Sequence, residues 1–451
     1  MTKRARTLSR SSQSTGTPVK PEVTVASATA SNASGHALKR TRTDVEFLPK
    51  KIATVECAAK ADSSPPFVKL MEYMQSTVIA SAKGDAVVYW MRMEDMRIND
   101  NRAFTQASAQ ARKDNIPLVV LFVLSPQDYV AHDRSARRID FMLRNLGVLK
   151  ESLAKLHIPL HTILHLTRKT LPSRVLSTLS EWHATYLYAN VEHELDELRR
   201  DIQVCELAKR DDKIKCTFLH DKCIIAPGIV KTKEGRGYTM LRQFLYVKAQ
   251  SSRLGTVDPL ACGVSMPPKG SAGSASRVNK YKDARDRVDA DTTSRLSPYL
   301  AAGVISAREC VRATMELSEN QSKKIDVSKE TGVGRWVQEL AWRDFYTHVL
   351  ALFPRVSMGR PFQEKFASVS WETNEEHLQA WKDGRTGVPI VDAGMRQVNK
   401  MGWMHNRLRM ITAMYLVKDL MIDWRLGEKK ALLRSPSVGE LTYGIKPRSS
   451  H

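Results

Sequence analysis

The sequence predicts an α/β N-terminal domain with a doubly wound parallel sheet, followed by an all-α domain. Up to about residue 242, short apolar runs alternate with amphipathic stretches, which is typical of a parallel sheet covered by helices. From Thr293 onward the strand pattern disappears and apolar residues recur at helical spacing. We therefore expect the sheet domain at residues 85–242, a Gly-, Ser- and Pro-containing connector at 243–288 and the helical domain at 289–428.

Five apolar runs are the expected strands, and the intervals between them are long enough for helices. The interval 137–156, for example, carries Ile139, Leu143, Leu146 and Leu149 at helical spacing. A ligand of such a sheet binds at the carboxyl ends of the strands, although no G-x-G-x-x-G follows the first strand. The expected strands are Ala86–Trp90, Leu118–Leu124, Leu160–Leu166, Ala184–Ala189 and Cys216–Leu219.

The composition favours a polyanionic partner. The 451 residues include 70 Lys and Arg against 48 Asp and Glu, a formal net charge of +22. Nucleic acid is the first candidate, and loose non-specific binding is the plainer alternative. The six cysteines form no C-x-x-C pair, so we expect no metal site and no disulfide framework. The longest apolar run, at 118–124, is too short for a membrane span.

Residues 1–84 are expected to be a disordered, basic, Ser- and Thr-rich targeting segment. Basic clusters at Lys3–Arg6, Lys39–Arg42 and Pro49–Lys51 are typical of nuclear import signals. The absence of acidic residues before Glu22 also permits a mitochondrial transit peptide. We expect the nucleus, with the mitochondrion as the alternative.

Hydroxyl groups and one guanidinium gather at the start of the helical domain. The run Thr293–Leu300 places Thr293, Ser294, Arg295 and Ser297 where a helix begins. Free N–H groups and hydroxyls at a helix start suit a phosphate group. The alternative is that Ser297 only caps the helix before Pro298.

A second pattern places two indoles, a carboxylate and a guanidinium on roughly one face of a helix. Trp336, Glu339, Trp342 and Arg343 lie at positions i, i+3, i+6 and i+7. Such a face suits a planar, hydrogen-bonding ligand such as a nucleobase. The alternative is that the two indoles only fill the core.

A third pattern is the run Gly402–Met410, which combines an aromatic ring, amides, cations and methionines. A base that has been flipped out of a duplex needs such a set, because it must be both stacked and hydrogen-bonded.

Together these motifs resemble class I cyclobutane pyrimidine dimer photolyases of the photolyase/cryptochrome family, of the fungal type. The resemblance covers about residues 85–428. It rests on Thr293–Leu300, Trp336–Tyr346, Gly387–Arg396, Gly402–Met410, Asp423–Arg425 and, near the first strand, Tyr89–Arg92 and Asp100–Ala103. The resemblance implies that the helical domain binds FAD.

The resemblance also implies roles for individual residues. Positions that contact the flavin in the family are matched by Tyr281, Thr293, Ser294, Arg295, Leu296, Ser297, Trp336 and Arg409. Glu339 and Trp342 match the residues that hydrogen-bond and stack on the flipped dimer. DNA or lesion contacts are matched by Arg285, Arg343, Trp403, Asn406 and Met410. Trp371 and Trp424 match the outer members of the tryptophan chain that reduces the flavin.

The activity that the resemblance implies is a lyase reaction, in which photoexcited reduced FAD splits a cyclobutane pyrimidine dimer in double-stranded DNA. A monomer is expected. The residues His132, Asp196 and Glu197 match the site of a 5,10-methenyltetrahydrofolate antenna, and solvated surface is their alternative interpretation.

The sequence departs from the family after Glu428. The family continues there with an aspartate pair, an asparagine beside the flavin and the innermost tryptophan, whereas residues 429–451 form a divergent tail. We therefore expect impaired activity and an unpaired buried charge at Arg409. The alternative functions are a cryptochrome-like blue-light photoreceptor and a non-catalytic DNA-binding remnant.

Overall fold

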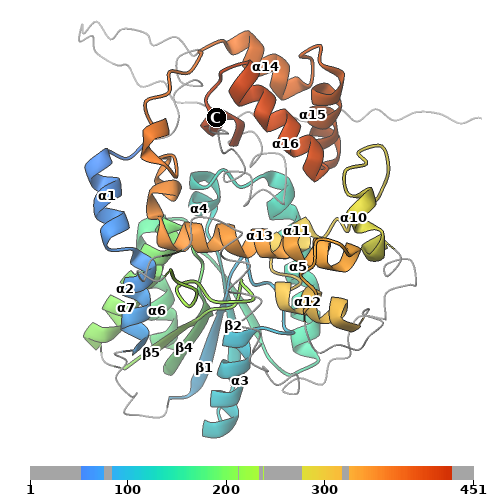
Figure 1. Cartoon of the computed structure of the whole chain (residues 1–451). Coiled ribbons are helices and arrows are strands. Elements are labelled where there is room, and N and C mark those ends of the chain that lie inside the picture. Colours follow the sequence, from blue (N-terminus) through green and yellow to red (C-terminus); the bar gives the residue numbers. More distant parts are fainter. Residues whose placement is uncertain are drawn as a thin grey trace, which may run out of the picture. The chain divides into compact units, whose positions relative to one another are not determined.

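The computed structural model describes residues 52–75, 84–211, 213–232, 237, 277–316 and 325–428. Its N-terminal domain is built on a five-stranded parallel sheet in the order β3-β2-β1-β4-β5, of which Figure 1 labels β2, β1, β4 and β5. The strands are β1 (Ala86–Met91), β2 (Leu118–Leu124), β3 (Leu160–Leu164), β4 (Ala184–Asn190) and β5 (Lys215–Leu219). The predicted doubly wound sheet is confirmed, because the chain runs outward from central β1 on one side and then on the other.

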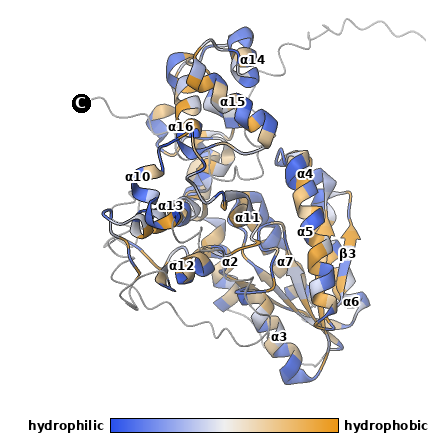
Figure 2. Ribbon diagram, turned by 90° about the vertical axis from the view of Figure 1, so that its right-hand side faces the viewer, coloured by the Kyte–Doolittle hydropathy of each residue, from blue (hydrophilic) through white to orange (hydrophobic). Residues whose placement is uncertain are grey.

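Both faces of the sheet are covered by helices, as the alternation of β1 shows. Val87, Tyr89 and Met91 pack in one core with α3 (Arg102–Asp114) and α5 (Ala136–Ala154). Val88 and Trp90 pack in the opposite core with α6 (Leu171–Glu181) and α7 (Leu195–Asp211). All of β1 is buried, which is why its sequence is an uninterrupted apolar run. Figure 2 shows apolar strands beside helices that mix polar and apolar residues. Two short elements, α4 (Pro126–Ala131) and η1 (Arg168–Thr170), complete the domain.

The C-terminal domain is helical, as predicted. Its longest helix, α13 (Gly332–Leu352), begins where the Thr331 hydroxyl accepts a hydrogen bond from the Gly334 amide. Among the described residues no helix has the length and apolar character of a membrane span. The other elements are α10 (Tyr281–Ala284), α11 (Ser297–Ala301), α12 (Ala307–Glu316), η3 (Pro354–Met358), η4 (Glu364–Phe366), α14 (Glu375–Asp383), α15 (Pro389–Met401), α16 (Asn406–Met414) and η5 (Tyr415–Asp419).

Two expected boundaries differ from the structure. Disorder over 1–84 is wrong for residues 52–75, which form α1 (Val55–Ser63) and α2 (Pro66–Gln75). Phe67 and Leu70 of α2 are buried in the sheet domain's core, and this burial offsets the loss of chain entropy. The expected connector also contains α10, which packs against α13. Residues 1–51, most of the connector and the tail lie outside the described residues.

A buried ion cluster links the sheet domain to the helical domain. Asp100 follows β1, Asp221 follows β5, and the guanidinium of Arg308 on α12 bonds both carboxylates, at 3.0 and 2.7 Å. Arg97 also pairs with Asp221, and the Ser306 hydroxyl bonds Asp100. Because Arg308 and Asp221 are each only 2% exposed, each charge depends on its partners.

We predict that Arg308→Gln lowers the free energy of unfolding by about 3–5 kcal/mol, because it leaves two buried carboxylates short of a cation. Arg312→Gln is the matched control, since Arg312 pairs with Asp100 at 3.1 Å but its side chain is 47% exposed. The control should cost about 1 kcal/mol or less. Chemical denaturation of both variants measures the difference, and equal losses would contradict the prediction.

A second buried network lies under the carboxyl end of β1. The Asp95 carboxylate accepts hydrogen bonds from the Tyr89 hydroxyl at 2.7 Å, the Arg92 amide at 2.7 Å and the Asn190 side chain at 2.9 Å. Burial outweighs these bonds and raises the pKa of Asp95 to about 6. The folded protein therefore holds this proton more tightly than the unfolded chain does.

The raised pKa of Asp95 predicts a pH dependence of stability. Its contribution is complete below the unfolded pKa of about 4 and is lost as the pH rises to about 6, a change of about 3 kcal/mol. Asp95→Asn removes this contribution. Stability measured by denaturation should therefore fall less steeply between pH 4 and 6 in the variant than in the natural protein. Parallel stability curves over that range would refute the assignment.

Candidate functional site

The helix α13 carries the central residues of the candidate site. Trp336 is buried at 7% exposure, whereas Trp342, less than two turns later, is 39% exposed. Glu339 lies between them, and one of its carboxylate oxygens accepts a hydrogen bond from Arg285 at 2.7 Å. The four predicted residues therefore lie on one helix, but the single shared face is wrong, since Trp336 and Arg343 are buried and Trp342 is exposed.

The carboxylate of Glu339 is partly withdrawn from water. Burial raises the pKa of Glu339 above its ordinary value, although Arg285, Arg335 and Arg409 oppose the shift. A carboxyl group in this setting can accept hydrogen bonds or, once protonated, donate one. Both modes suit the edge of a base.

An aromatic platform surrounds Trp342. Its ring stacks on Tyr346 with the centroids 5.5 Å apart at 22°, and it meets Phe345 edge to face at 5.9 Å. Because these neighbours fix the indole while part of it stays exposed, it can stack on a planar ligand.

The run Thr293–Ser297 lies beside Trp336. The indole N–H donates to the Ser294 hydroxyl at 3.4 Å, and Tyr281 packs in the same apolar cluster as Trp336 and Leu296. Arg295 adopts a left-handed backbone with φ 53°, and its guanidinium lies 4.8 Å from the centre of the Trp403 ring. The capping alternative for Ser297 is wrong, because the N-cap position of α11 is Leu296 and has no side-chain cap.

The start of α16 adds the third group of predicted residues. Asn406 and Met410 are exposed, and the Arg409 guanidinium donates to the Asn406 side chain at 2.6 Å. The expectation of an unpaired buried charge at Arg409 is therefore wrong: the residue is only partly buried and has this partner. Trp403 precedes the helix and meets His405 edge to face at 6.4 Å.

The structure places Arg343 away from these residues. Its side chain is 7% exposed, and its guanidinium donates to the carbonyl oxygens of Lys222 at 2.8 Å and Leu300 at 3.4 Å. These bonds join α13 to the segment after β5 and to α11. Such burial fits a structural role better than the predicted DNA contact.

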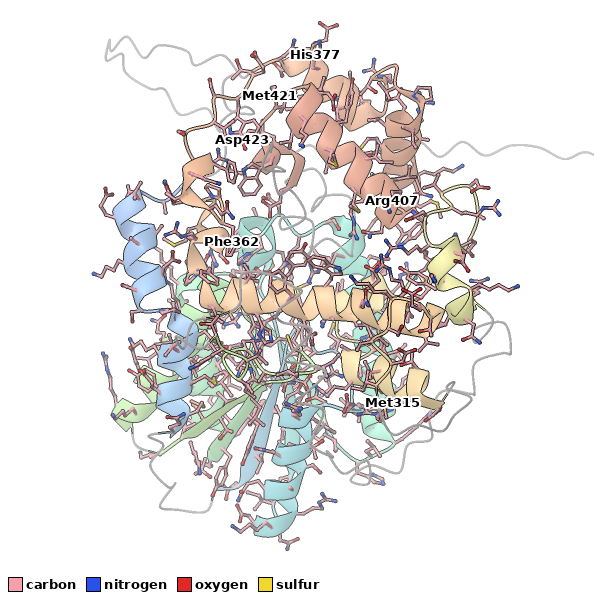
Figure 3. All side chains as sticks on the ribbon, viewed as in Figure 1. Met315, Phe362, His377, Arg407, Met421 and Asp423 are labelled. Carbon is pink, nitrogen blue, oxygen red and sulfur yellow. The ribbon has the colours of Figure 1, made fainter. Side chains whose placement is uncertain are left out.

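Trp371 and Trp424, the predicted electron-transfer residues, lie on neighbouring segments. The Glu372 amide donates to the Met421 carbonyl at 2.8 Å, and Glu372 pairs with Ile422 in an isolated parallel bridge. Both indoles are partly buried, and Met421 and Asp423 mark this region in Figure 3. Their role stays a prediction.

The predicted antenna residues form a cluster at the start of α7. His132 contacts Glu197 at 3.1 Å, and Asp196 accepts a bond from Arg168 at 2.8 Å. One carboxylate oxygen of Glu197 is buried without a hydrogen-bond partner, and burial together with Glu194 raises its pKa. The interpretation as solvated surface is therefore wrong for Glu197.

The same cluster has spacing that a metal ion could use, because ligand atoms of His132, Glu194 and Glu197 lie within 4.8 Å of one another. However, Arg134 lies 3.4 Å from Glu194, and Arg168 lies 3.1 Å from His132. Two guanidinium groups already compensate this cluster, so we assign no metal to it.

Sequence reasoning missed Asp286 and named Arg407 only as one of the cations of the run Gly402–Met410. Arg407, on the first turn of α16 and labelled in Figure 3, donates to the Asp286 carboxylate at 2.7 and 3.0 Å. Asp286 directly follows Arg285, the partner of Glu339. For Asp286 the only signal in the sequence was its position next to Arg285, and such a pair of opposite charges is common on protein surfaces.

Comparisons with known proteins show the family of the chain. Two family models match the chain: DNA photolyase over residues 87–263 and the FAD binding domain of DNA photolyase over residues 336–432. The deoxyribodipyrimidine photo-lyase of Neurospora crassa is 34% identical, over 85% of this chain and 71% of its own length. The mitochondrial deoxyribodipyrimidine photo-lyase of Saccharomyces cerevisiae is 28% identical, over 88% and 83%. The crystal structure of a class III photolyase from Agrobacterium tumefaciens matches with TM-score 0.62 and 26% identity, over 82% and 81%.

The chain is a two-domain flavoprotein of the photolyase type, with a parallel-sheet domain followed by a helical FAD-binding domain. The chain belongs to the DNA photolyase family.

The residues present fit an FAD molecule. The Ser294 hydroxyl, the Trp336 indole N–H, the Tyr281 hydroxyl and the Arg409 guanidinium are donors, and the phosphates, ribityl chain and ring edge of FAD are acceptors. The apolar packing of Tyr281 and Leu296 beside Trp336 adds a surface that suits the non-polar parts of such a cofactor.

Proposed function

We propose that this protein repairs cyclobutane pyrimidine dimers in double-stranded DNA under blue light. The observation that carries the proposal is the pairing, on one helix, of a partly buried carboxylate and a fixed, partly exposed indole. Glu339 supplies hydrogen bonds and Trp342 supplies a stacking surface, which are the two contacts that a flipped-out pyrimidine dimer requires.

The cofactor for this reaction is FAD, which supplies the photoexcited electron when it is bound. Tyr281, Ser294, Trp336 and Arg409 would hold it, together with the neighbouring Thr293, Arg295, Leu296 and Ser297. The protein's own part is to bind, to orient and to exclude water. Trp371 and Trp424 would carry electrons toward the flavin from the surface.

The start of α16 would receive the DNA. Asn406 offers an amide and Met410 is 46% exposed. The Arg295 guanidinium lies over the ring of Trp403. A flexible thioether beside an aromatic platform suits the irregular surface of a distorted lesion. The net charge of +22 would attract the duplex to the protein.

The test is light-dependent repair of a duplex with one thymine dimer, with Glu339→Gln compared to the natural protein. Loss of a hydrogen bond to a charged group costs about 1.5–3 kcal/mol, so the repair rate should fall by about 10- to 150-fold. Glu330→Gln is the control, since Glu330 is 81% exposed and pairs with Lys282 on the outer side of α10. No light-dependent repair by flavin-loaded natural protein would refute the proposed function. If repair is absent, flavin absorbance in the purified protein would indicate a light sensor. DNA binding by protein that takes up no flavin would indicate a DNA-binding remnant.

We also propose that His132, Asp196 and Glu197 hold a 5,10-methenyltetrahydrofolate antenna. The buried, unpartnered oxygen of Glu197 supports this proposal, because a carboxylate suits the amine and amide edge of a pterin. Folate added to the flavin-loaded natural protein should absorb more strongly than free folate and should transfer energy to the flavin. Glu197→Ala should abolish both effects. Folate that binds the natural protein and this variant equally would lie elsewhere.

A monomer in the nucleus is the proposed state of the protein. The basic clusters of residues 1–84 support nuclear import, and a mitochondrial yeast relative keeps the mitochondrion as the second location. Imaging of a tagged full-length chain separates the two locations.

A further inference from the structure

Four charged side chains form a continuous chain at the mouth of the proposed lesion site. Glu339 on α13 pairs with Arg285 at 2.7 Å, Arg285 lies 3.8 Å from Asp286, and Asp286 pairs with Arg407 at 2.7 Å. Because Arg285 and Asp286 are consecutive residues just after α10, ion pairs from this segment reach both α13 and α16.

Each guanidinium in this chain is held by a carboxylate. Arg407 is 34% exposed and lies on the first turn of α16, beside the DNA-facing Asn406 and Trp403. Arg285 is 22% exposed and holds Glu339, the residue proposed to meet the bases. Two good phosphate ligands are therefore occupied inside the free protein.

Arg407 and Arg285 also outweigh the effect of burial and hold the pKa of Asp286 below its ordinary value. Asp286 is therefore a carboxylate at neutral pH. A carboxylate bonds a guanidinium with the same geometry that a phosphodiester uses, so the two compete for one cation.

We propose that Asp286 is a specificity-determining residue that mimics a DNA phosphate and keeps Arg407 from binding undamaged DNA. When a dimer enters the site, Glu339 turns to the bases and leaves Arg285. Asp286 then pairs with the freed Arg285, and Arg407 is released to a backbone phosphate. Undamaged DNA does not draw Glu339 away, so Arg407 stays occupied. The inference rests on the proposed function, because it takes Glu339 as the group that meets the dimer.

The experiment measures binding of the full-length protein in the dark to a labelled duplex, with and without one thymine dimer, over a range of salt concentrations. Asp286→Ala should bind undamaged duplex about 2- to 5-fold more tightly, since an exposed ion pair of this kind no longer has to be broken. Its binding should weaken with salt more steeply, by about one phosphate contact. Affinity for the dimer duplex should change less, so the preference for damage should fall.

The matched control is Asp289→Ala. Asp289 lies three residues away and pairs with Arg287 at 2.6 Å, with side chains 62% and 63% exposed, so the same charge is removed without touching the four-residue chain. This control should leave the preference for damage unchanged. In the double variant Asp286→Ala, Arg407→Gln, affinity for undamaged duplex should return to that of Arg407→Gln alone.

Two results would overturn the inference: equal effects of the two alanine variants, or weaker binding of undamaged DNA by Asp286→Ala. The first would mean a general change in charge, and the second would mean that Asp286 positions Arg407 for DNA. Failure of the proposed function shows separately, as an absence of any preference for the dimer in the natural protein. The undamaged-duplex measurements still decide whether Asp286 restrains Arg407.

Discussion

The arrangement of the two domains depends on a buried ion cluster. Asp100 and Asp221 come from loops at the carboxyl ends of β1 and β5, where a parallel sheet collects its loops. Arg308 of α12 satisfies both carboxylates and also donates to backbone carbonyl oxygens of Asp100, Asp221 and Cys223. An apolar contact would tolerate sliding, whereas a guanidinium fork fixes both distance and direction. The start of the helical domain is thereby fixed to one edge of the sheet.

The helix α13 is also held against the sheet domain, and it carries the residues of the candidate site. Arg343 ties the helix to the segment after β5, and the Asp344 carboxylate accepts the Ile224 amide at 2.9 Å. These contacts use the buried face of the helix, so the neighbouring residues Glu339 and Trp342 are left on the more accessible face. The predicted DNA contact at Arg343 is better understood as part of this support. The six residues 339–344 thus contain both the support and the ligand-facing groups, which spacing alone could not separate.

The sequence predicted what depends on local pattern. All five strands were found within about two residues at their ends, the buried β1 as an uninterrupted apolar run and β3 and β5 as apolar residues mixed with polar ones. The helices α1 and α2 were missed although α2 is rich in apolar residues, because Phe67 and Leu70 gain stability only from the core they enter. The patterns around Trp336, Glu339 and Asn406 were predicted to bind a base because they combine aromatic, charged and amide side chains. Asp286 was missed, and Arg407 was given no role of its own, because their significance lies in a contact across 121 positions of the chain.

The choice of ion pairs at the site, rather than apolar contacts, has a physical reason. A surface that must receive DNA needs exposed cations, yet free cations bind any duplex through its phosphates. Pairing each guanidinium with a carboxylate lowers that general attraction without removing the cation, and exposed pairs exchange partners at small cost. Arg308, by contrast, is 2% exposed and cannot exchange, because breaking its contacts would leave buried charges uncompensated. The same residue type therefore serves as a fixed support where it is buried and as an exchangeable ligand where it meets solvent.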